Sequence, residues 1–443
     1  MTRPNGVESV TSSRVRTASS WLAGDHGRTL SQLWFVSVGL SGLNFVSTIV
    51  IVARTGATVF AEYTVALSLM TVGTALMDGG LASTFGMLAV DATAAGSRYQ
   101  AFRALLAEYR LKILALGSIA SLALAVFVGR NSAVFASGRW WAIVPFVAVS
   151  AAMARSSQLN SLLYARGRFG SYGVVMLAPP VLRMCLVIAV VAGFGSFTLP
   201  TLFVITLASP LFGLVWAEIA VNRETLPPDA APVIGSSERR EVAEFLAPTA
   251  TSVILSGITF QLTAVGGSFY AVGPAIATYG VFMRANTIVS MLFGPTSQYV
   301  GRHLRAKGAV PSRNALENRY LLLTVLAFAL YACVSLIIYD ALGLRYAHYA
   351  LGQTRAYAVF VFYSGLGCLQ LALDGILAAR GRARHRVPGT VMLCLLNAVL
   401  IPIVRPDTIS SLVLIDATSM LSIVAYYWLE LVLARRSLRS GQC

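Results

Sequence analysis

A ten-residue segment occurs twice in this 443-residue chain. Leu159-Asn-Ser-Leu-Leu-Tyr-Ala-Arg-Gly-Arg168 returns 214 residues later as Leu373-Asp-Gly-Ile-Leu-Ala-Ala-Arg-Gly-Arg382, with six identical positions. Two shorter matches have nearly the same offset, Trp216-x-Glu218 with Trp428-x-Glu430 and Ala61-Glu-Tyr63 with Ala277-Thr-Tyr279. Because three matches keep one order at nearly one spacing, the chain is predicted to be a duplicated unit.

Long apolar runs recur through both halves. The chain is 56% hydrophobic and 12% charged, and soluble domains contain about twice that share of charged residues. Apolar runs of about 17–25 residues can cross the hydrocarbon core of a bilayer as helices. The composition therefore indicates an all-α, multi-pass membrane protein. The twelve predicted spans are about 31–53, 60–88, 112–129, 140–163, 171–193, 199–221, 245–268, 275–298, 318–338, 350–373, 388–404 and 408–433.

The basic residues predict the orientation of the chain. Of the 34 arginines and lysines, 25 lie in the two termini and the even-numbered connections, and six lie in the odd-numbered connections. Positively charged loops stay on the cytoplasmic side, so both termini are predicted to be cytoplasmic, in a cell (inner) membrane. The net charge of +16 is accounted for by this topology, and nucleic acid is not an expected partner.

The repeat and the spans together predict two lobes. Each half has six spans, and an even number leaves both copies in the same orientation. Two six-helix lobes related by a pseudo-twofold axis along the membrane normal are therefore expected. The predicted segments are a cytoplasmic tail over 1–30, an N-lobe over 31–221, a cytoplasmic linker over 222–244, a C-lobe over 245–434 and a cytoplasmic tail over 435–443.

No motif in the sequence predicts covalent chemistry. The four histidines have no metal-binding spacing, and the five cysteines form no CxxC pair. The sequence also has no GxxxxGK[ST] loop that would bind the phosphates of a nucleotide. We therefore expect no enzyme activity, no cofactor and no metal site.

Three arginines fall inside predicted spans: Arg155, Arg183 and Arg284. A rise of about 1.5 Å per residue places each near mid-depth, where a cation facing lipid is costly. Two acids, Asp78 and Asp416, are comparably deep. These acids could neutralise the arginines, or the arginines could line a cationic cavity that holds an anion such as a diphosphate. Because the deep arginines outnumber the deep acids, we favour the cavity.

Several short segments resemble the Wzx-type flippases, the polysaccharide-transporter branch of the multidrug/oligosaccharidyl-lipid/polysaccharide exporter superfamily. Ala53-Arg54-Thr-Gly56-x-x-x-Phe60-Ala-Glu-Tyr63 is similar to that family's junction between its first two helices, although Ala61 replaces the usual glycine. Asp78-Gly79-Gly80-Leu81 resembles a stretch late in the second helix. Thr278-Tyr279…Arg284 and Pro295-Thr-Ser297 look like the eighth-helix pattern.

The resemblance implies a carrier that moves undecaprenyl-diphosphate-linked oligosaccharide to the outer leaflet, by alternating access, for O-antigen or exopolysaccharide synthesis. It implies Arg54 and Arg284 as cavity residues, and the depth argument adds Arg155 and Arg183. Either Asp78 or Asp416 would then bind a coupling proton or sodium ion. Expected partners are the lipid-linked oligosaccharide and membrane lipids, with the polysaccharide polymerase and export machinery as further candidates.

Two other functions stay open at this point. An ion-coupled exporter of drugs or small molecules shares the twelve-span plan. Such exporters usually have an acidic cavity with an aspartate in the first helix, and the first span here contains no acid. A membrane-embedded polysaccharide polymerase or ligase would need acceptor-binding outer loops, and the outer loops here are short. The flippase is therefore the favoured interpretation.

Overall fold

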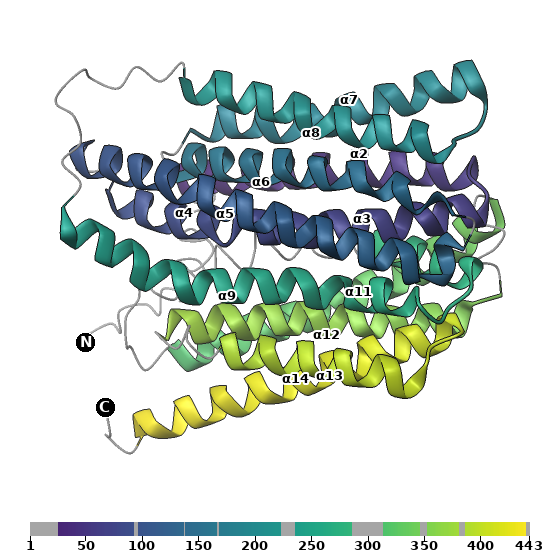
Figure 1. Ribbon diagram of the computed structural model, residues 1–443. Helices are drawn as coiled ribbons and strands as arrows, with labels where there is room; N and C mark the ends of the chain where they lie inside the picture. Colours follow the sequence, from purple (N-terminus) through teal and green to yellow (C-terminus); the bar gives the residue numbers. More distant parts are fainter. Residues whose placement is uncertain are drawn as a thin grey trace, which may run out of the picture.

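The computed structural model describes residues 25–92, 96–136, 138–165, 168–222, 235–285, 313–345, 352–380 and 386–439. These residues form helices and short connections, with no strand among them. The helices lie roughly side by side in one elongated bundle (Figure 1). We call the end of the bundle where α9 begins and α14 ends the terminal end, and the other the opposite end.

The helices follow the predicted six-plus-six plan when α3 and α4 are counted together as the second span. The N-lobe contains α2 (Asp25–Ala53), α3 (Ala57–Asp78), α4 (Leu81–Ala92), α5 (Gly96–Asn131), α6 (Val144–Ala165), α7 (Phe169–Phe194) and α8 (Leu199–Asn222), with short 3-10 turns at Ala133–Phe135 and Arg139–Ile143. The C-lobe contains α9 (Ser236–Gly267), a helical segment over 273–285, α11 (Arg313–Arg345), α12 (Thr354–Ala379), α13 (Arg386–Val404) and α14 (Ile409–Arg439).

Ten of the described helices are long and apolar enough to cross a membrane. Helix α6 is not among them, because Arg155, Gln158 and Asn160 lower its mean hydropathy. The predicted span at 275–298 is described as far as residue 285, where it is helical. The expected fold class, an all-α membrane protein of two helical lobes, is confirmed.

Several helices extend beyond the predicted spans. Helix α5 begins at Gly96, well before the apolar stretch that starts near residue 112. Helix α9 begins at Ser236, inside the predicted linker, and α14 continues to Arg439, inside the predicted tail. Hydropathy locates only the apolar part of a helix, so polar end turns escape it. Residues 1–24 and 223–234 of the predicted tail and linker lie outside the described residues.

The second predicted span, 60–88, consists of two helices. Helix α3 ends at Asp78, and Gly79 and Gly80 follow with φ of 50° and 73°. Such positive φ values favour glycine, so this pair lets the chain turn before α4. A Cβ atom on Gly80 would lie 2.8 Å from the backbone nitrogen of Ala250 in α9. The break therefore also lets the second lobe approach closely.

The two lobes contact each other mainly along α3 and α9. Gly257 of α9 lies directly against Ala75 of α3. At the opposite end, Ser268 ties the lobes together, because its carbonyl oxygen accepts hydrogen bonds from Ser132 Oγ and from the backbone nitrogen of Ala133, both at 3.0 Å. The interface therefore runs along the bundle and is closed at the opposite end by hydrogen bonds.

Candidate functional site

Tyr63 of α3 is buried, with 1% of its surface exposed. Its ring packs against Phe60 and Phe146, with ring centroids 6.2 Å away in each case. Its hydroxyl lies 3.0 Å from Thr206 Oγ1 of α8 and accepts a hydrogen bond of 3.3 Å from Arg183 Nη2 of α7. The phenol therefore connects three helices of the N-lobe.

Arg183 follows the Pro179-Pro180 pair inside α7. Proline carries no backbone N–H, so the pair removes the helix donors of the Val175 and Met176 carbonyls, one turn earlier. The Pro179 carbonyl itself accepts a hydrogen bond of 2.8 Å from Ser209 Oγ of α8, which joins α7 to α8 at this point. Arg183 Nε is buried and has no hydrogen-bond partner among the described residues. A guanidinium has five N–H donors, so the contact with Tyr63 leaves Arg183 able to bind an anion.

Arg284 brings a second guanidinium to the same place from the C-lobe. Its helical segment, 273–285, packs closely on α3, where Gly280 lies directly against Thr64. The groups within electrostatic range of Arg284 in the described part of the chain are Tyr63 and Arg183, with no carboxylate among them. We call Tyr63, Arg183, Thr206 and Arg284 the Tyr63 centre. This centre is cationic and includes residues of both lobes.

Two of the four predicted cavity arginines, Arg54 and Arg155, lie outside the Tyr63 centre. Arg54 is exposed in the turn after α2 at the opposite end, where its carbonyl oxygen accepts a hydrogen bond from the Phe197 nitrogen at 3.3 Å. Arg155 of α6 forms an ion pair with Glu218 of α8, with 2.6 Å between Nη2 and Oε1. Neither has a described contact with the Tyr63 centre. The substrate-binding role predicted for these two residues stays a prediction.

Asp416 of α14 lies in a polar cluster inside the C-lobe. The carboxylate is buried and accepts hydrogen bonds of 2.5 Å from Thr263 of α9 and from Tyr279 of the 273–285 segment. Tyr279 and Arg284 lie on the same short helix, so this helix connects the carboxylate to the Tyr63 centre. Asp416 is therefore well placed for the predicted ion-coupling role, which stays a prediction.

Asp78, the other predicted coupling residue, has a structural task. Its Oδ1 accepts a hydrogen bond of 3.1 Å from the backbone nitrogen of Ala82 and one of 3.4 Å from Gln158 Nε2. The first bond satisfies an N–H in the first turn of α4, as side-chain oxygens do at helix N-termini. Asp78 thus stabilises the start of α4, and ion binding there also stays a prediction.

Sequence reasoning predicted a mid-membrane depth for Arg183 and Arg284, which stays a prediction, and did not identify Tyr63 beside them. Tyr63 stands in the segment that resembles the family's first junction, so a signal for it was present in the sequence. Thr206 gave no comparable signal, because its importance comes from α8 lying beside α3. Glu218 stands in one of the repeated segments, but its pairing with Arg155 depends on how α8 packs against α6.

The sequence matches no protein-family profile and no curated protein. Solved structures nevertheless share its fold, among them transporters of the MOP superfamily. An inward-facing multidrug resistance MATE family transporter has a TM-score of 0.62 at 10% identity, with 91% of this chain and 95% of that chain covered. The lipid II flippase MurJ, in an inward closed conformation, has a TM-score of 0.64 at 12% identity, with 90% and 87% covered.

A third similar structure is the MATE multidrug transporter DinF-BH in complex with R6G. Its TM-score is 0.57 at 16% identity, with 90% of this chain and 94% of that chain covered. At these identities the similarity establishes the fold alone. The chain is a multi-pass membrane protein with the two-lobe fold of MOP-superfamily transporters.

Proposed function

We propose that this protein is a flippase that moves undecaprenyl-diphosphate-linked oligosaccharide from the cytoplasmic to the outer leaflet of the inner membrane. The observation that carries the proposal is the pair Arg183 and Arg284 beside Tyr63, with no described carboxylate within electrostatic range of Arg284. Guanidinium groups bind phosphate oxygens with paired hydrogen bonds. Two of them, one on each lobe, suit the two phosphates of a diphosphate.

The substrate path follows from the position of this centre. The terminal end is taken to face the cytoplasm, as the arginine distribution predicts. The diphosphate enters from that end and binds Arg183 and Arg284, while the polyprenyl chain stays in the lipid. Rocking of the lobes about the α3–α9 contact then breaks the Ser132–Ser268 tie at the opposite end and exposes the headgroup there. No covalent bond is made or broken.

Asp416 supplies a route for ion coupling. A proton or sodium ion at this carboxylate competes with the hydrogen bonds that Thr263 and Tyr279 donate to it. Because Tyr279 shares its helix with Arg284, a change at Asp416 alters the position of that arginine. Ion binding in the C-lobe thereby changes the affinity of the Tyr63 centre for the substrate.

The test uses the purified protein in vesicles that contain a fluorescent undecaprenyl-diphosphate oligosaccharide. Arg183→Gln and Arg284→Gln each remove one cation from the Tyr63 centre, and each is expected to slow flipping by about tenfold or more, as charge-assisted phosphate contacts are lost. Arg355→Gln is the matched control, since Arg355 is exposed at the start of α12. Wild-type flipping by Arg284→Gln would refute the proposal.

The second candidate is an ion-coupled exporter of drugs or small molecules. The buried carboxylate of Asp416 favours it, because a buried acid can bind a cationic compound as well as a coupling ion. Deletion of the gene separates the candidates. A flippase deletion leaves lipid-linked repeat units on the cytoplasmic side, and a drug exporter deletion changes drug sensitivity. A polymerase deletion would leave the repeat units on the outer side.

A further inference from the structure

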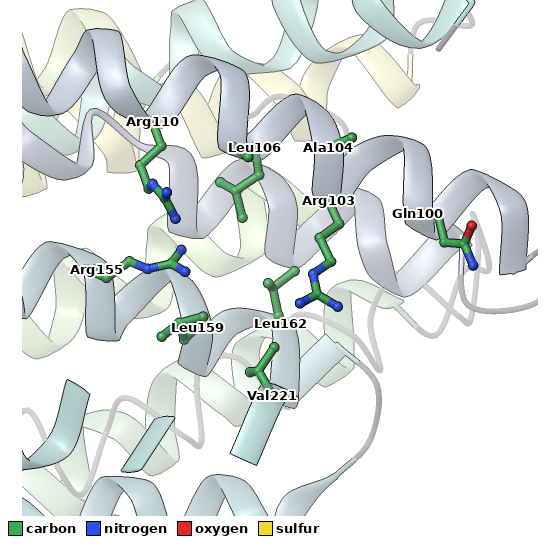
Figure 2. A pocket seen from close by; sticks show the side chains of 10 residues that line it. Gln100, Arg103, Ala104, Leu106, Arg110, Arg155, Leu159, Leu162 and Val221 are labelled. Atoms are coloured by element: carbon green, nitrogen blue, oxygen red, sulfur yellow. The ribbon is translucent and has the colours of Figure 1, made fainter. Parts of the chain in front are cut away.

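A second group of arginines lines a cavity of about 470 Å³ in the N-lobe. Arg103 and Arg110 come from α5, and Arg155 comes from α6. Figure 2 shows the guanidinium groups of Arg110 and Arg155 directed into the same space, with Arg103 beside Leu162. We call this cavity the N-lobe arginine pocket. None of the residues of the Tyr63 centre lines it.

The described residues leave a surplus of positive charge in this pocket. Arg110 lies within electrostatic range of both Arg155 and Glu218, and Glu218 is already paired with Arg155. The nearest acid along α5, Glu108, is paired with Arg239 of α9 at 3.2 Å. Arg110 and Arg155 therefore share the carboxylate of Glu218, and Arg103 adds a third cation to the lining of the pocket. Two neighbouring guanidiniums repel each other unless an anion lies between them.

In the C-lobe, the arginines at the terminal end pair with a buried glutamate. At its terminal end Arg380 and Arg435 both bind Glu317, at 2.8 and 3.1 Å, and the Glu317 side chain is fully buried. Asn314 and Asn318 accept further hydrogen bonds from the same two arginines. Both arginines of this cluster therefore pair with one buried acid, although Arg380 Nη1 and Arg435 Nε have no hydrogen-bond partner among the described residues. The N-lobe arginine pocket has a cavity in place of a buried acid.

The walls of the pocket are apolar. Leu106, Leu159 and Val221 line it beneath the arginines. Exposed apolar side chains continue from it on both flanking helices, with Leu111 of α5 71% exposed and Val215 of α8 57% exposed. In a membrane protein such side chains face lipid. The pocket therefore combines a cationic head region with an apolar wall beside the lipid-facing surface.

The depth of these arginines in the membrane fits a ligand with an anionic headgroup and an apolar tail. Arg110 directly precedes the apolar part of α5, which places it at the boundary between hydrocarbon and headgroups. The pocket lies near the end of α8 and so near the terminal end, which is predicted to be cytoplasmic. Anionic lipids are enriched in the cytoplasmic leaflet, and basic pockets between helices there bind their headgroups.

We propose that the N-lobe arginine pocket binds the phosphate group of an anionic phospholipid from the surrounding leaflet. The phosphate lies among Arg103, Arg110 and Arg155 and offsets their repulsion, and the first carbons of an acyl chain lie along the leucines. The bound lipid holds α5 against α6 and α8, and thereby stabilises the N-lobe. This site is separate from the Tyr63 centre, none of whose residues lines it.

The experiment measures the thermal unfolding midpoint of the purified full-length protein in detergent. Phosphatidylglycerol is titrated in, with phosphatidylcholine as the neutral comparison. Phosphatidylglycerol is expected to raise the midpoint of the wild type, and Arg103→Gln/Arg110→Gln is expected to need at least about tenfold more of it. Lys112→Gln is the matched control, because Lys112 lies on the same helix but is exposed and does not line the pocket.

Each remaining outcome decides against the proposal. An undiminished phosphatidylglycerol effect in the double variant would overturn it, as would an equal effect of phosphatidylcholine. Equal stabilisation by millimolar inorganic phosphate alone would identify a soluble anion as the ligand. If the double variant does not fold, Arg103→Gln alone is measured, with the lipid retained by each protein counted by native mass spectrometry. The probe carries no sugar or polyprenyl chain, so failure here leaves the flippase proposal untouched.

Discussion

Arg183 Nη2 of α7 donates a hydrogen bond of 3.3 Å to Tyr63 OH of α3, across 120 residues of sequence. The phenol is buried and also contacts Thr206, so it holds the guanidinium in one position before any anion arrives. A preorganised cation loses less entropy when it binds its ligand. The Tyr63 hydroxyl therefore positions Arg183 without itself having to carry charge.

Tyr63→Phe tests this positioning role. The ring stays, so packing against Phe60 and Phe146 is kept, while Arg183 and Thr206 lose their shared partner. We expect flipping in vesicles to fall by about tenfold, since a hydrogen bond to a charged group contributes about 1.5–3 kcal/mol. Tyr426→Phe, which alters a partly buried tyrosine near the middle of α14, is the control and should flip normally. Normal flipping by Tyr63→Phe would show that the hydroxyl does not position Arg183.

Asp416→Asn tests ion coupling. The amide keeps the size of the carboxylate but can accept only through one oxygen, so Thr263 or Tyr279 loses its acceptor. We expect transport in vesicles to lose its dependence on an imposed proton or sodium gradient. The lost acceptor should also lower stability by about 1–3 kcal/mol, seen as a lower unfolding midpoint. Asp407→Asn, in the exposed turn before α14, should change neither quantity. Unchanged gradient dependence in Asp416→Asn would place the coupling ion elsewhere.

Glu317→Gln tests the arginine cluster of the C-lobe. The Arg380 side chain is only 4% exposed, and the substitution removes the negative charge that pairs with it. Breaking a buried ion pair in this way costs about 3–5 kcal/mol, so the unfolding midpoint and the yield of folded protein should both drop sharply. Glu244→Gln removes the exposed partner of Arg240 and should leave the unfolding midpoint nearly unchanged, because solvent screens that ion pair. Similar losses in the two variants would contradict the importance assigned to Glu317.

Gly80→Ala tests the break between α3 and α4. The residue has φ of 73°, and an added Cβ would lie 2.8 Å from the Ala250 nitrogen in the other lobe. Backbone strain alone costs about 1–2 kcal/mol. The clash between the added Cβ and the Ala250 nitrogen also pushes the two lobes apart. We expect a lower unfolding midpoint and slower flipping. Gly42→Ala is the control, because nothing lies within 4 Å of its added Cβ. A Gly80→Ala protein as stable as the control would argue against close lobe contact at this point.

The site shows where sequence reasoning stops. Depth along a span is readable because each residue adds a fixed rise, so Arg183 and Arg284 could be placed near mid-membrane. The direction in which each side chain points depends on how its helix is rotated against its neighbours. Arg155 therefore could not be assigned to Glu218, nor Arg183 to Tyr63, before the packing of α6 on α8 and of α7 near α3 was known.

By itself, the sequence determined the duplicated six-helix plan and the positions of the apolar spans, because hydrocarbon imposes length and composition on every helix that crosses it. Only the tertiary structure decided that Tyr63 contacts Arg183, that Glu317 pairs with both Arg380 and Arg435, and that Arg103 and Arg110 line a cavity with Arg155. These contacts join residues far apart in the chain. The rotation of each helix and its crossing with its neighbours decide which residues meet. The apolar composition that lipid requires of a single span does not determine either.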